Sequence, residues 1–265
     1  MARIMLPAGL WERLEPLLPK PKSPGPKGGR PPKPHRNVLE GILYVLRTGI
    51  SWKHLPEQFG CSGMTCWRRL RDWQAAGIWK ELQVRLLSEL RAQDKIDWGL
   101  AVVDSSFVRA LGGGEDTGPN PTDRGKLGSK HHLLIDSHGI PLAEEVTAAN
   151  VNDVVELIPL VVAIPPVAGK PGRPKERPRA LQGDRGYDSE PARQFLRWLG
   201  IKPILAKRHT GHGSGLGRTR WPVERTISWF HNFMRLRIRR ERRTDIHKAF
   251  LTLAASLICM TFVLQ

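Results

Sequence analysis

The spacing of apolar residues changes at about residue 97, and this change constrains the fold more than any other feature. Before it, apolar residues recur every three or four positions, as on one face of a helix. After it, short apolar runs bounded by turn residues alternate with segments of helical spacing. Strands are predicted at 100–104, 131–136, 140–147, 180–184 and 201–206, and helices from about 152, at 189–199 and at 218–243. This βββαβαβα order predicts an α/β (α+β mixed) domain, a mixed sheet with helices on its faces.

The first 97 residues carry the pattern of a separate helical domain. Helices are predicted at 7–18, 37–47, 62–76 and 78–93. A segment with Gly60 joins the second to the third, and Ser62 can cap the third, so the pair fits a helix-turn-helix. The basic residues predicted to face outward toward DNA are Arg68, Arg69 and Arg71. A helical bundle without DNA contacts is the alternative.

A linker at 19–35 separates the first two of these helices. It combines prolines and glycines with lysines and arginines and contains no acid, so it cannot bury a core. Two interpretations remain open. The linker is either a solvated spacer or a basic arm that places Arg30, within Gly29-Arg30-Pro31, in the minor groove of DNA.

The charge of the chain indicates a polyanionic partner. There are 42 Lys+Arg against 25 Asp+Glu, which gives a formal net charge of +17. The basic residues are spread along a sequence that is 40% hydrophobic and can therefore fold. This distribution favours an enzyme that acts on nucleic acid over a protein that binds it through a basic tail alone.

Neither end of the chain predicts export or a membrane anchor. The N-terminal segment carries acids early and lacks the long apolar run of a signal peptide. The apolar segment 249–265 is short for a membrane span and is interrupted by hydroxyl residues, so it is predicted to pack on the sheet. The cysteines, Cys61, Cys66 and Cys259, lack the spacing of a zinc site or a disulfide framework. We therefore expect a cytoplasmic protein with buried thiols.

The segment 218–243 is predicted to form one arginine-rich helix with Pro222 in its first turn. Apolar residues recur along one face of that helix: Val223, Ile227, Phe230, Met234 and Ile238. Glu224 lies beside this face. A carboxylate among arginines usually forms a salt bridge, which is the interpretation for Glu241; for Glu224 it is one of two alternatives.

The other alternative for Glu224 is a metal site shared with two aspartates. Asp104 follows the apolar run 100–103, and Asp184 ends the run that begins at residue 180. Carboxylates brought together from two strand ends and a helix are costly to bury unless a cation compensates them. Mg²⁺ takes carboxylate oxygens as ligands and shares its other positions with water and phosphates. The pattern therefore predicts that Asp104, Asp184 and Glu224 bind Mg²⁺.

Basic residues flank these acids in the sequence. The candidates for contacts with DNA phosphates are Lys126, Lys130, Arg185, Arg220 and Arg225. A solvated or salt-bridged surface is the alternative for each. Trp221 and Trp229 could stack on a flipped base, but packing in the core is the favoured interpretation.

Three short blocks occur in order along the chain. They are Val103-Asp104-Ser105-Ser106, Gly183-Asp184-Arg185-Gly186-Tyr187-Asp188 and Arg220-Trp221-Pro222-Val223-Glu224-Arg225. They resemble the catalytic blocks of DDE transposases of the bacterial insertion sequence five family. The segments Arg124-Gly125-Lys126 and Gly128-Ser129-Lys130 and the helix-turn-helix also look like that family, so the resemblance spans nearly the whole chain.

The surroundings of the last acid depart from a related family in two positions. The insertion sequence four group places Tyr, Arg, Glu and Lys around that acid. Arg220 and Glu224 match the pattern, whereas Gly217 stands in the Tyr position and His231 in the Lys position. His231 is kept as a candidate phosphate contact.

The resemblance implies a metal-dependent DNA transposase with a ribonuclease H-like catalytic domain at 98–265. Asp104, Asp184 and Glu224 would be the catalytic acids and hold two Mg²⁺ ions, for which Mn²⁺ can substitute. Two ions can activate an attacking water or 3′-hydroxyl and stabilise the leaving oxygen. The other acids near predicted turns and helix starts are not expected to bind metal: Asp136, Asp153 and Asp188.

The implied partners are double-stranded DNA and a second copy of the chain. The DNA comprises the terminal inverted repeats of an insertion sequence and the target DNA, and a homodimer would hold two ends. The protein is expected to associate with the bacterial nucleoid when it is bound to DNA, and not with a membrane. Two alternatives remain: a domesticated, non-catalytic DNA-binding protein, and a ribonuclease H-like nuclease without strand transfer.

Overall fold

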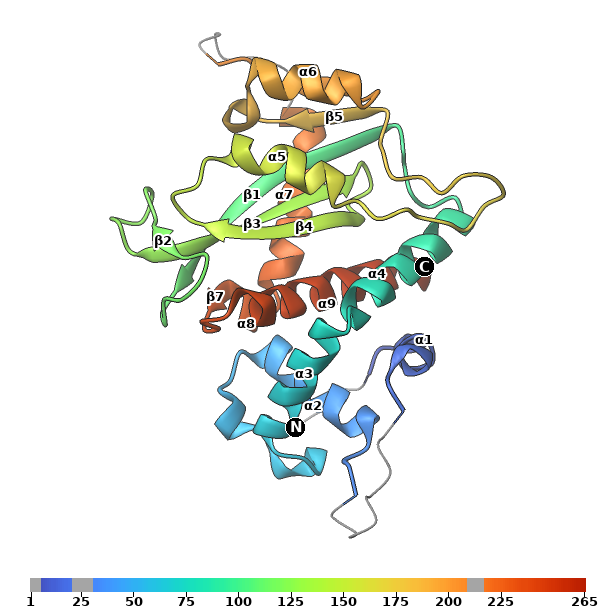
Figure 1. Cartoon of the computed structure of the whole chain (residues 1–265), viewed down its shortest axis with the longest axis vertical. Helices are drawn as coiled ribbons and strands as arrows, with labels where there is room; N and C mark the ends of the chain where they lie inside the picture. The colour runs from blue at the N-terminus through green and yellow to red at the C-terminus, as the bar shows by residue number, and fades with distance from the viewer. Residues whose placement is uncertain (1–5, 21–30, 209–216) are drawn as a thin grey trace.

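The computed structural model describes residues 6–20, 31–208 and 217–265. A seven-stranded sheet with helices packed against it occupies the upper part of Figure 1, and a group of helices lies beneath it. The long helix α9 (Thr244–Val263) crosses between the two parts. The two-domain division at residue 97 stays a prediction, and α4 (Ile78–Ala92) packs along α9 and so touches both parts.

The sheet is built around its longest strand, β1 (Leu100–Ala110). The other strands are β2 (Gly118–Pro119), β3 (Leu127–Asp136), β4 (Pro141–Ala148), β5 (Ala180–Gly183), β6 (Lys202–Leu205) and β7 (Ile238–Arg239). On one side of β1, β3 and β4 follow in antiparallel pairing; on the other, β5 and β6 follow in parallel pairing. The order β4-β3-β1-β5-β6 is that of a ribonuclease H-like sheet, so the predicted fold class is confirmed.

The predicted hairpin joins β3 to β4, but the strands β1 and β3 are longer than predicted. The side chain of Asp136 fixes the hairpin turn by accepting hydrogen bonds from His138 N at 3.0 Å and Ile140 N at 2.8 Å. The strand predicted at 100–104 continues to Ala110 because its polar residues also pair with β3, as far as Arg109 opposite Gly128. A prediction based on apolar residues underestimates the length of a strand whose outer half is polar.

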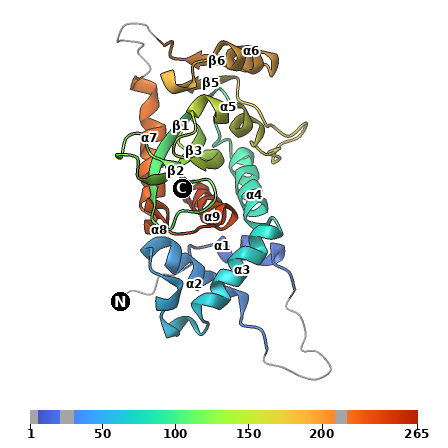
Figure 2. The same cartoon turned by 60° about the vertical axis from the view of Figure 1, so that its left-hand side comes forward.

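Helices cover the two faces of the sheet (Figure 2). The helix α5 (Asp153–Val162) packs on β3 and β4, and α7 (Gly217–His231) packs along β1 and β3. Val102 and Ile135 lie opposite each other in the register and contact Val223 of α7. The helix α6 (Glu190–Trp198) covers β6 and contacts α5.

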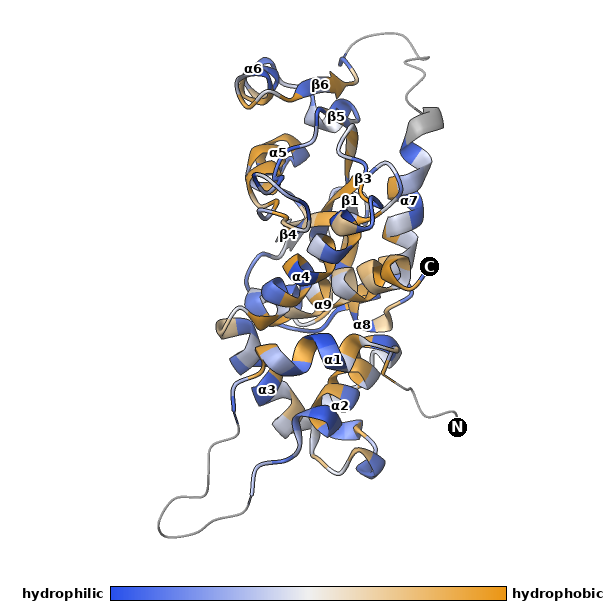
Figure 3. Ribbon diagram, turned by 90° about the vertical axis from the view of Figure 1, so that its right-hand side faces the viewer, coloured by the Kyte–Doolittle hydropathy of each residue, from blue (hydrophilic) through white to orange (hydrophobic). Residues whose placement is uncertain are grey.

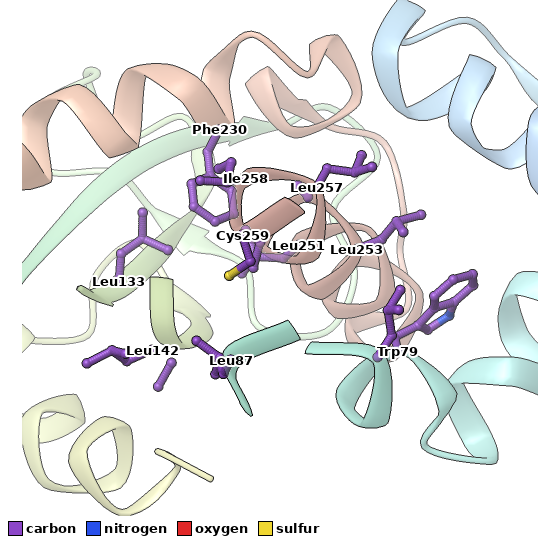
Figure 4. Close-up of a cluster of buried hydrophobic side chains, with 14 of the residues drawn as sticks. Trp79, Leu87, Leu133, Leu142, Phe230, Leu251, Leu253, Leu257, Ile258 and Cys259 are labelled. Atoms are coloured by element: carbon purple, nitrogen blue, oxygen red, sulfur yellow. The ribbon is translucent and has the colours of Figure 1, made fainter. Parts of the chain in front are cut away.

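The apolar C-terminal segment forms the central core helix, as predicted. In Figure 4, side chains from α9, α4, α7 and the sheet meet around Cys259, with Leu87, Leu133 and Phe230 among them. Among the described residues, α9 is long and apolar enough to cross a membrane, but 78% of its most apolar window is buried inside the protein. Figure 3 shows α9 as mostly apolar.

The N-terminal part contains the predicted helical pair. Its helices are α1 (Leu10–Leu14), α2 (His35–Thr48) and α3 (Gly63–Ala75). Ser62 caps α3 as predicted, its Oγ accepting a hydrogen bond from Thr65 N at 3.3 Å. Cys61 and Cys66 are buried free thiols with their Sγ atoms 3.4 Å apart, and Cys259 is buried too.

The segment 218–243 is not one helix, contrary to the prediction. The helix α7 ends at His231, and a short helix α8 (Met234–Arg237) and then β7 follow. The chain turns here because buried Arg235 donates to Ile50 O at 2.8 Å and to Glu241 Oε1 at 2.8 Å. Met234 is exposed instead of continuing the apolar face. Pro222 lies in the second turn of α7, because the helix begins at residue 217.

Candidate active site

Asp104 and Asp184 lie beside each other because β1 and β5 are parallel neighbours. The register pairs Val102 with Gln182, so the residues two positions further along fall together at the end of β5. Asp184 follows the last residue of β5, and its Oδ1 accepts a hydrogen bond from Gly186 N at 2.8 Å. The carboxyl ends of parallel strands are where sheets of this kind place their binding sites.

The stretch of β1 that carries Asp104 borders an opening in the sheet. On that edge, β1 pairs with β5 as far as Val102 and with β7 only from Arg109. Within the described residues, no strand pairs with the edge between these two segments, and residues 104–107 are partly exposed. Residues 104–107 are thus partly accessible to solvent.

Arg220 of α7 joins the two aspartates. Its Nη2 donates to Asp104 Oδ2 at 2.7 Å, and its Nη1 lies 3.8 Å from Asp184 Oδ2. Glu224 lies one turn further along the same side of α7 and is exposed. The negative charge of Glu224 acts on Arg220 together with those of the aspartates. The guanidinium group of Arg220 therefore contacts both predicted aspartates, and the charge of Glu224 acts on it from one helical turn away.

Burial and charge act in opposite directions on the pKa values of this cluster. Burial raises the pKa of Asp104 above its ordinary value, the cation of Arg220 counteracts that rise, and the charge of Asp184 adds to it. Burial alone would lower the pKa of Arg220, but the carboxylates outweigh it and the pKa is raised. The side chain of Asp104 is 13% exposed and that of Asp184 38%, so Asp104 depends more on a neighbouring cation.

The donor set suits a divalent cation by its chemistry. In the part of the chain that the structure describes, no three His, Cys, Asp or Glu side chains lie close enough together to hold a metal ion as they stand. Two carboxylates nevertheless pair with one cationic group, and the charge of a third acts on that group. Hard cations such as Mg²⁺ take such oxygens as ligands. The residues thus fit an ion at the place where a guanidinium now compensates their charge.

A second charged cluster lies on the opposite face of β1, one residue from Asp104. Side chains alternate along a strand, so Ser105 points away from Arg220, toward the start of α5. There Ser105 Oγ donates to Asp153 Oδ1 at 2.8 Å, and Lys130 Nζ donates to the same oxygen at 2.9 Å. Lys130 is only 5% exposed. The structure therefore does not place it on a surface that faces DNA, as the sequence had suggested.

The relatives of the chain agree with this geometry. The family described as "Transposase DDE domain" matches residues 99–259, and that described as "Putative transposase of IS4/5 family" matches residues 6–83. The chain belongs to the DDE transposases. The predicted resemblance is thereby confirmed, and with it a DNA transposase. Enzymes of this family generally use divalent metal ions.

Two relatives of this transposase come from Burkholderia cepacia. The "Putative transposase for insertion sequence element IS402" is 62% identical over 143 residues, which are 54% of this chain and 68% of the relative. The "Insertion element IS402 uncharacterized 16.2 kDa protein" is 53% identical over 123 residues, 46% of this chain and 84% of the relative. A solved pre-cleavage Mos1 transpososome aligns with 89% of this chain and 80% of its own at 13% identity and a TM-score of 0.29. That likeness adds nothing to the fold assignment, which rests on the strand order.

Of the remaining basic candidates, Arg225 of the transposase lies between two tryptophans. Its guanidinium carbon is 4.4 Å from the ring centre of Trp221 and 4.6 Å from that of Trp229. Trp229 packs partly buried against Phe262 in the core, as favoured, whereas Trp221 is 52% exposed. Only Trp221 therefore keeps a face that could stack on a base.

The other predicted DNA contacts are distributed around the site and over α3. Lys126 is exposed, Arg185 is partly exposed in the loop after Asp184, and His231 Nε2 lies 3.4 Å from Ser106 Oγ on the α7 side of β1.

On α3, Arg68 is exposed, and Arg69 and Arg71 are partly exposed. Arg71 pairs with Asp72 at 2.7 Å. Arg30 lies outside the described residues.

The sequence did not indicate the cluster of Ser105, Lys130 and Asp153. Its members come from β1, β3 and the start of α5, and only the pairing of the strands brings them together. The one available signal was local: Asp153 was expected at a helix start, and it is the first residue of α5. A helix-start aspartate is usually explained by the helix alone.

Proposed function

We propose that this transposase binds the terminal inverted repeats of an insertion sequence, cleaves the ends and joins them to target DNA by two-metal phosphoryl transfer. Asp104, Asp184 and Glu224 are the proposed metal ligands. The observation that carries the proposal is the pairing of Asp104 and Asp184 with the guanidinium of Arg220. Glu224 follows Arg220 by one turn of α7, and its charge acts on the same cation.

Two divalent ions, when bound, would polarise the scissile phosphate and activate the attacking oxygen. The chain itself supplies rigid placement. Asp104 is held within a paired strand, where its Oδ1 accepts a hydrogen bond from Ser105 N at 2.9 Å. Asp184 is held by Gly186 N at the head of a short turn. Preorganised carboxylates of this kind lose little freedom when the substrate binds.

The proposed path of the DNA follows the basic and aromatic groups near the site. The Arg225–Trp221 stack is close in sequence to Glu224, and His231 is close in space to Ser106 of β1. Exposed Lys126 lies before the start of β3, and Arg68 projects from α3 in the other part of the molecule. We propose that one inverted-repeat end is a duplex long enough to contact both the part with the sheet and the part with α3. We propose that two copies of the chain, each with one end, form the homodimer that acts on target DNA in the cytoplasm.

The test is cleavage of a duplex that carries one end of the element. Wild-type protein should nick the end in Mg²⁺ or Mn²⁺ and stop when a chelator is added, and it should join the end to a target plasmid. Glu224→Gln keeps the shape of the side chain but removes its charge, so cleavage should fall by about two or more orders of magnitude.

The matched control is Glu190→Gln. Glu190 is exposed on α6 and pairs with Arg197 at 3.1 Å, so its loss should cost about 0–1 kcal/mol of stability and leave the rate intact. Equal cleavage rates for Glu224→Gln and Glu190→Gln would show that Glu224 is not a catalytic residue. Tight end binding without cleavage would favour a domesticated DNA-binding protein, and cleavage without joining would favour a nuclease.

A further inference from the structure

The ion pair between buried Lys130 and partly buried Asp153 lies directly behind the strand that carries Asp104. Lys130 Nζ lies 2.9 Å from Asp153 Oδ1 and 2.7 Å from the carbonyl oxygen of Val151. The side chains of the pair are 6% and 24% exposed. Burying two charges is costly, and replacing such a pair by apolar residues is often neutral or stabilising. Stability alone is therefore a weak reason for a charged pair at this place.

Ser105 connects this pair to Asp104 through both its side chain and its backbone. Ser105 Oγ donates to Asp153 Oδ1 at 2.8 Å, and Ser105 N donates to Asp104 Oδ1 at 2.9 Å. The bond to Asp153 anchors β1 from the side of α5. The bond from Ser105 N orients the carboxylate of Asp104 on the side of α7. Among the described strands, β1 has a partner on one edge only along this stretch, so an anchor from a helix limits its movement.

The same aspartate also lies close to the second acid. A methyl group added to Gly186 would lie 3.0 Å from Asp184 Oδ1 and 3.2 Å from Asp153 Oδ2. The two carboxylates therefore approach Gly186 together, and Gly186 N holds Asp184. One oxygen of Asp153 binds Ser105 and Lys130, and the other borders the turn that carries Asp184.

We infer that Lys130 and Asp153 are positioning residues of the transposase, which hold Asp104 in place through Ser105. Lys130 holds Asp153 in place through their ion pair, Asp153 accepts a hydrogen bond from the hydroxyl of Ser105, and the backbone N–H of Ser105 donates to the carboxylate of Asp104. The inference rests on the proposed function, since it assigns the pair to the orientation of a proposed metal ligand. Partners that orient metal ligands typically change metal affinity or activity by about 10–100-fold when they are replaced.

The experiment compares Asp153→Asn with Glu156→Gln, three residues further along α5, where the acid is partly buried but outside this cluster. Three quantities are measured on the full chain: the cleavage rate at saturating end DNA, the Kd for end DNA, and the Kd for Mn²⁺ without DNA. Asp153→Asn should lower the rate or the Mn²⁺ affinity about 10–100-fold. The Kd for end DNA should stay within about threefold, because neither residue faces the DNA. If the pair were purely structural, Asp153→Asn would change the melting temperature but would not lower the rate or the Mn²⁺ affinity while end binding stayed unchanged.

Ser105 provides a second test that leaves the ion pair intact. Ser105→Ala removes only the hydroxyl and should lower the rate, and Ser105→Thr, which keeps a hydroxyl on a strand residue, should recover most of it. Comparing Ser105→Ala with Ser105→Thr shows whether the hydroxyl of Ser105 affects the rate, even if Asp153→Asn does not fold.

Three results would overturn the inference: Mn²⁺ affinity and rate of Asp153→Asn equal to those of Glu156→Gln, equal rates for Ser105→Ala and Ser105→Thr, or a rate loss matched by lost end binding. If the wild-type protein binds Mn²⁺ but does not cleave, the proposed function fails, and the Mn²⁺ affinities still test the positioning. A wild-type chain that binds no Mn²⁺ overturns both.

Discussion

Replacing Arg220 by alanine should destabilise the transposase and at the same time strengthen its binding of divalent ions. In the structure, the Arg220 guanidinium is the cation that compensates Asp104, Asp184 and Glu224. Without it, Asp104 remains largely buried and loses the cation that donates a hydrogen bond to it. A divalent ion then meets the same carboxylates without a competing positive charge. The variant should be less stable without metal but gain more stability from added metal, so one titration with Mn²⁺ separates the two effects.

The size of the loss follows from the contacts. A hydrogen bond to a charged group contributes about 1.5–3 kcal/mol, and breaking a buried ion pair costs about 3–5 kcal/mol. Arg220 and Asp104 keep 25% and 13% of their side chains exposed, so solvent screens the pair, and the expected cost lies between the upper part of the first range and the lower part of the second. We expect the variant to lose about 2–4 kcal/mol of unfolding free energy. At about 2–4 °C per kcal/mol for a chain of this size, the melting temperature should fall by about 4–16 °C.

Thermal melting with increasing Mn²⁺ measures both effects. Binding to the folded state alone adds about 2.7 kcal/mol at a concentration of 100 Kd. Because Arg220→Ala binds the ion more tightly, Mn²⁺ should raise its melting temperature more than that of the wild type. Arg197→Ala, which removes an exposed pair with Glu190, is the control and should change neither value. If Arg220→Ala melts like this control, or if its response to Mn²⁺ equals that of the wild type, Arg220 does not compensate the acids.

Three further outcomes are expected. Arg68→Ala should weaken end binding and reduce the slope of log affinity against log salt by about 0.9, measured by gel shift, and an unchanged slope would show that Arg68 contacts no phosphate. The unfolding free energy should fall as the pH drops from 6.5 toward 4, by up to about 1.4 kcal/mol per pH unit for each histidine. The reason is that burial lowers the pKa of His131 to about 3 and that of His132 to about 4, so the unfolded chain binds more protons; urea unfolding at several pH values measures this. Asp136→Asn should steepen that loss, because burial raises the pKa of Asp136 to about 6 and its protonation stabilises the folded chain as the pH falls from about 6 to 4; equal slopes for the variant and the wild type would contradict this.

The parts of the fold that sequence patterns predicted are those governed by local spacing. The hairpin at 137–139 was readable because a turn of fixed type joins two apolar runs. The positions of Asp104 and Asp184 at the end of apolar runs indicated neighbouring strands, and the parallel register brings them together. The apolar composition of segment 249–265 also indicated the core helix α9, since a helix buried on all sides is apolar on all sides.

The parts that sequence patterns did not predict depend on long-range partners. The break after His231 is fixed by Arg235, whose guanidinium bonds to Ile50 O far away in the sequence. The burial of Lys130 depends on Asp153, 23 residues further along the chain. A lysine or arginine reads as a surface residue unless its acceptor is known, because its long side chain can reach in many directions. Charged residues were therefore the main source of error.

Glu224 and Glu241 show why the acids in the arginine-rich segment could not be separated by spacing. Glu241 stands between Arg240 and Arg242, which made them its expected partners, but adjacent side chains point in different directions. Its partner is Arg235, across the turn after α8, and both are buried. Removing the charge of Glu241 would leave a buried arginine uncompensated and damage the fold, so it cannot serve as a control for Glu224. Glu224 is exposed, and its charge adds to those of two other acids around Arg220. We propose that this shared cation distinguishes Glu224, as a member of the site, from a structural salt bridge.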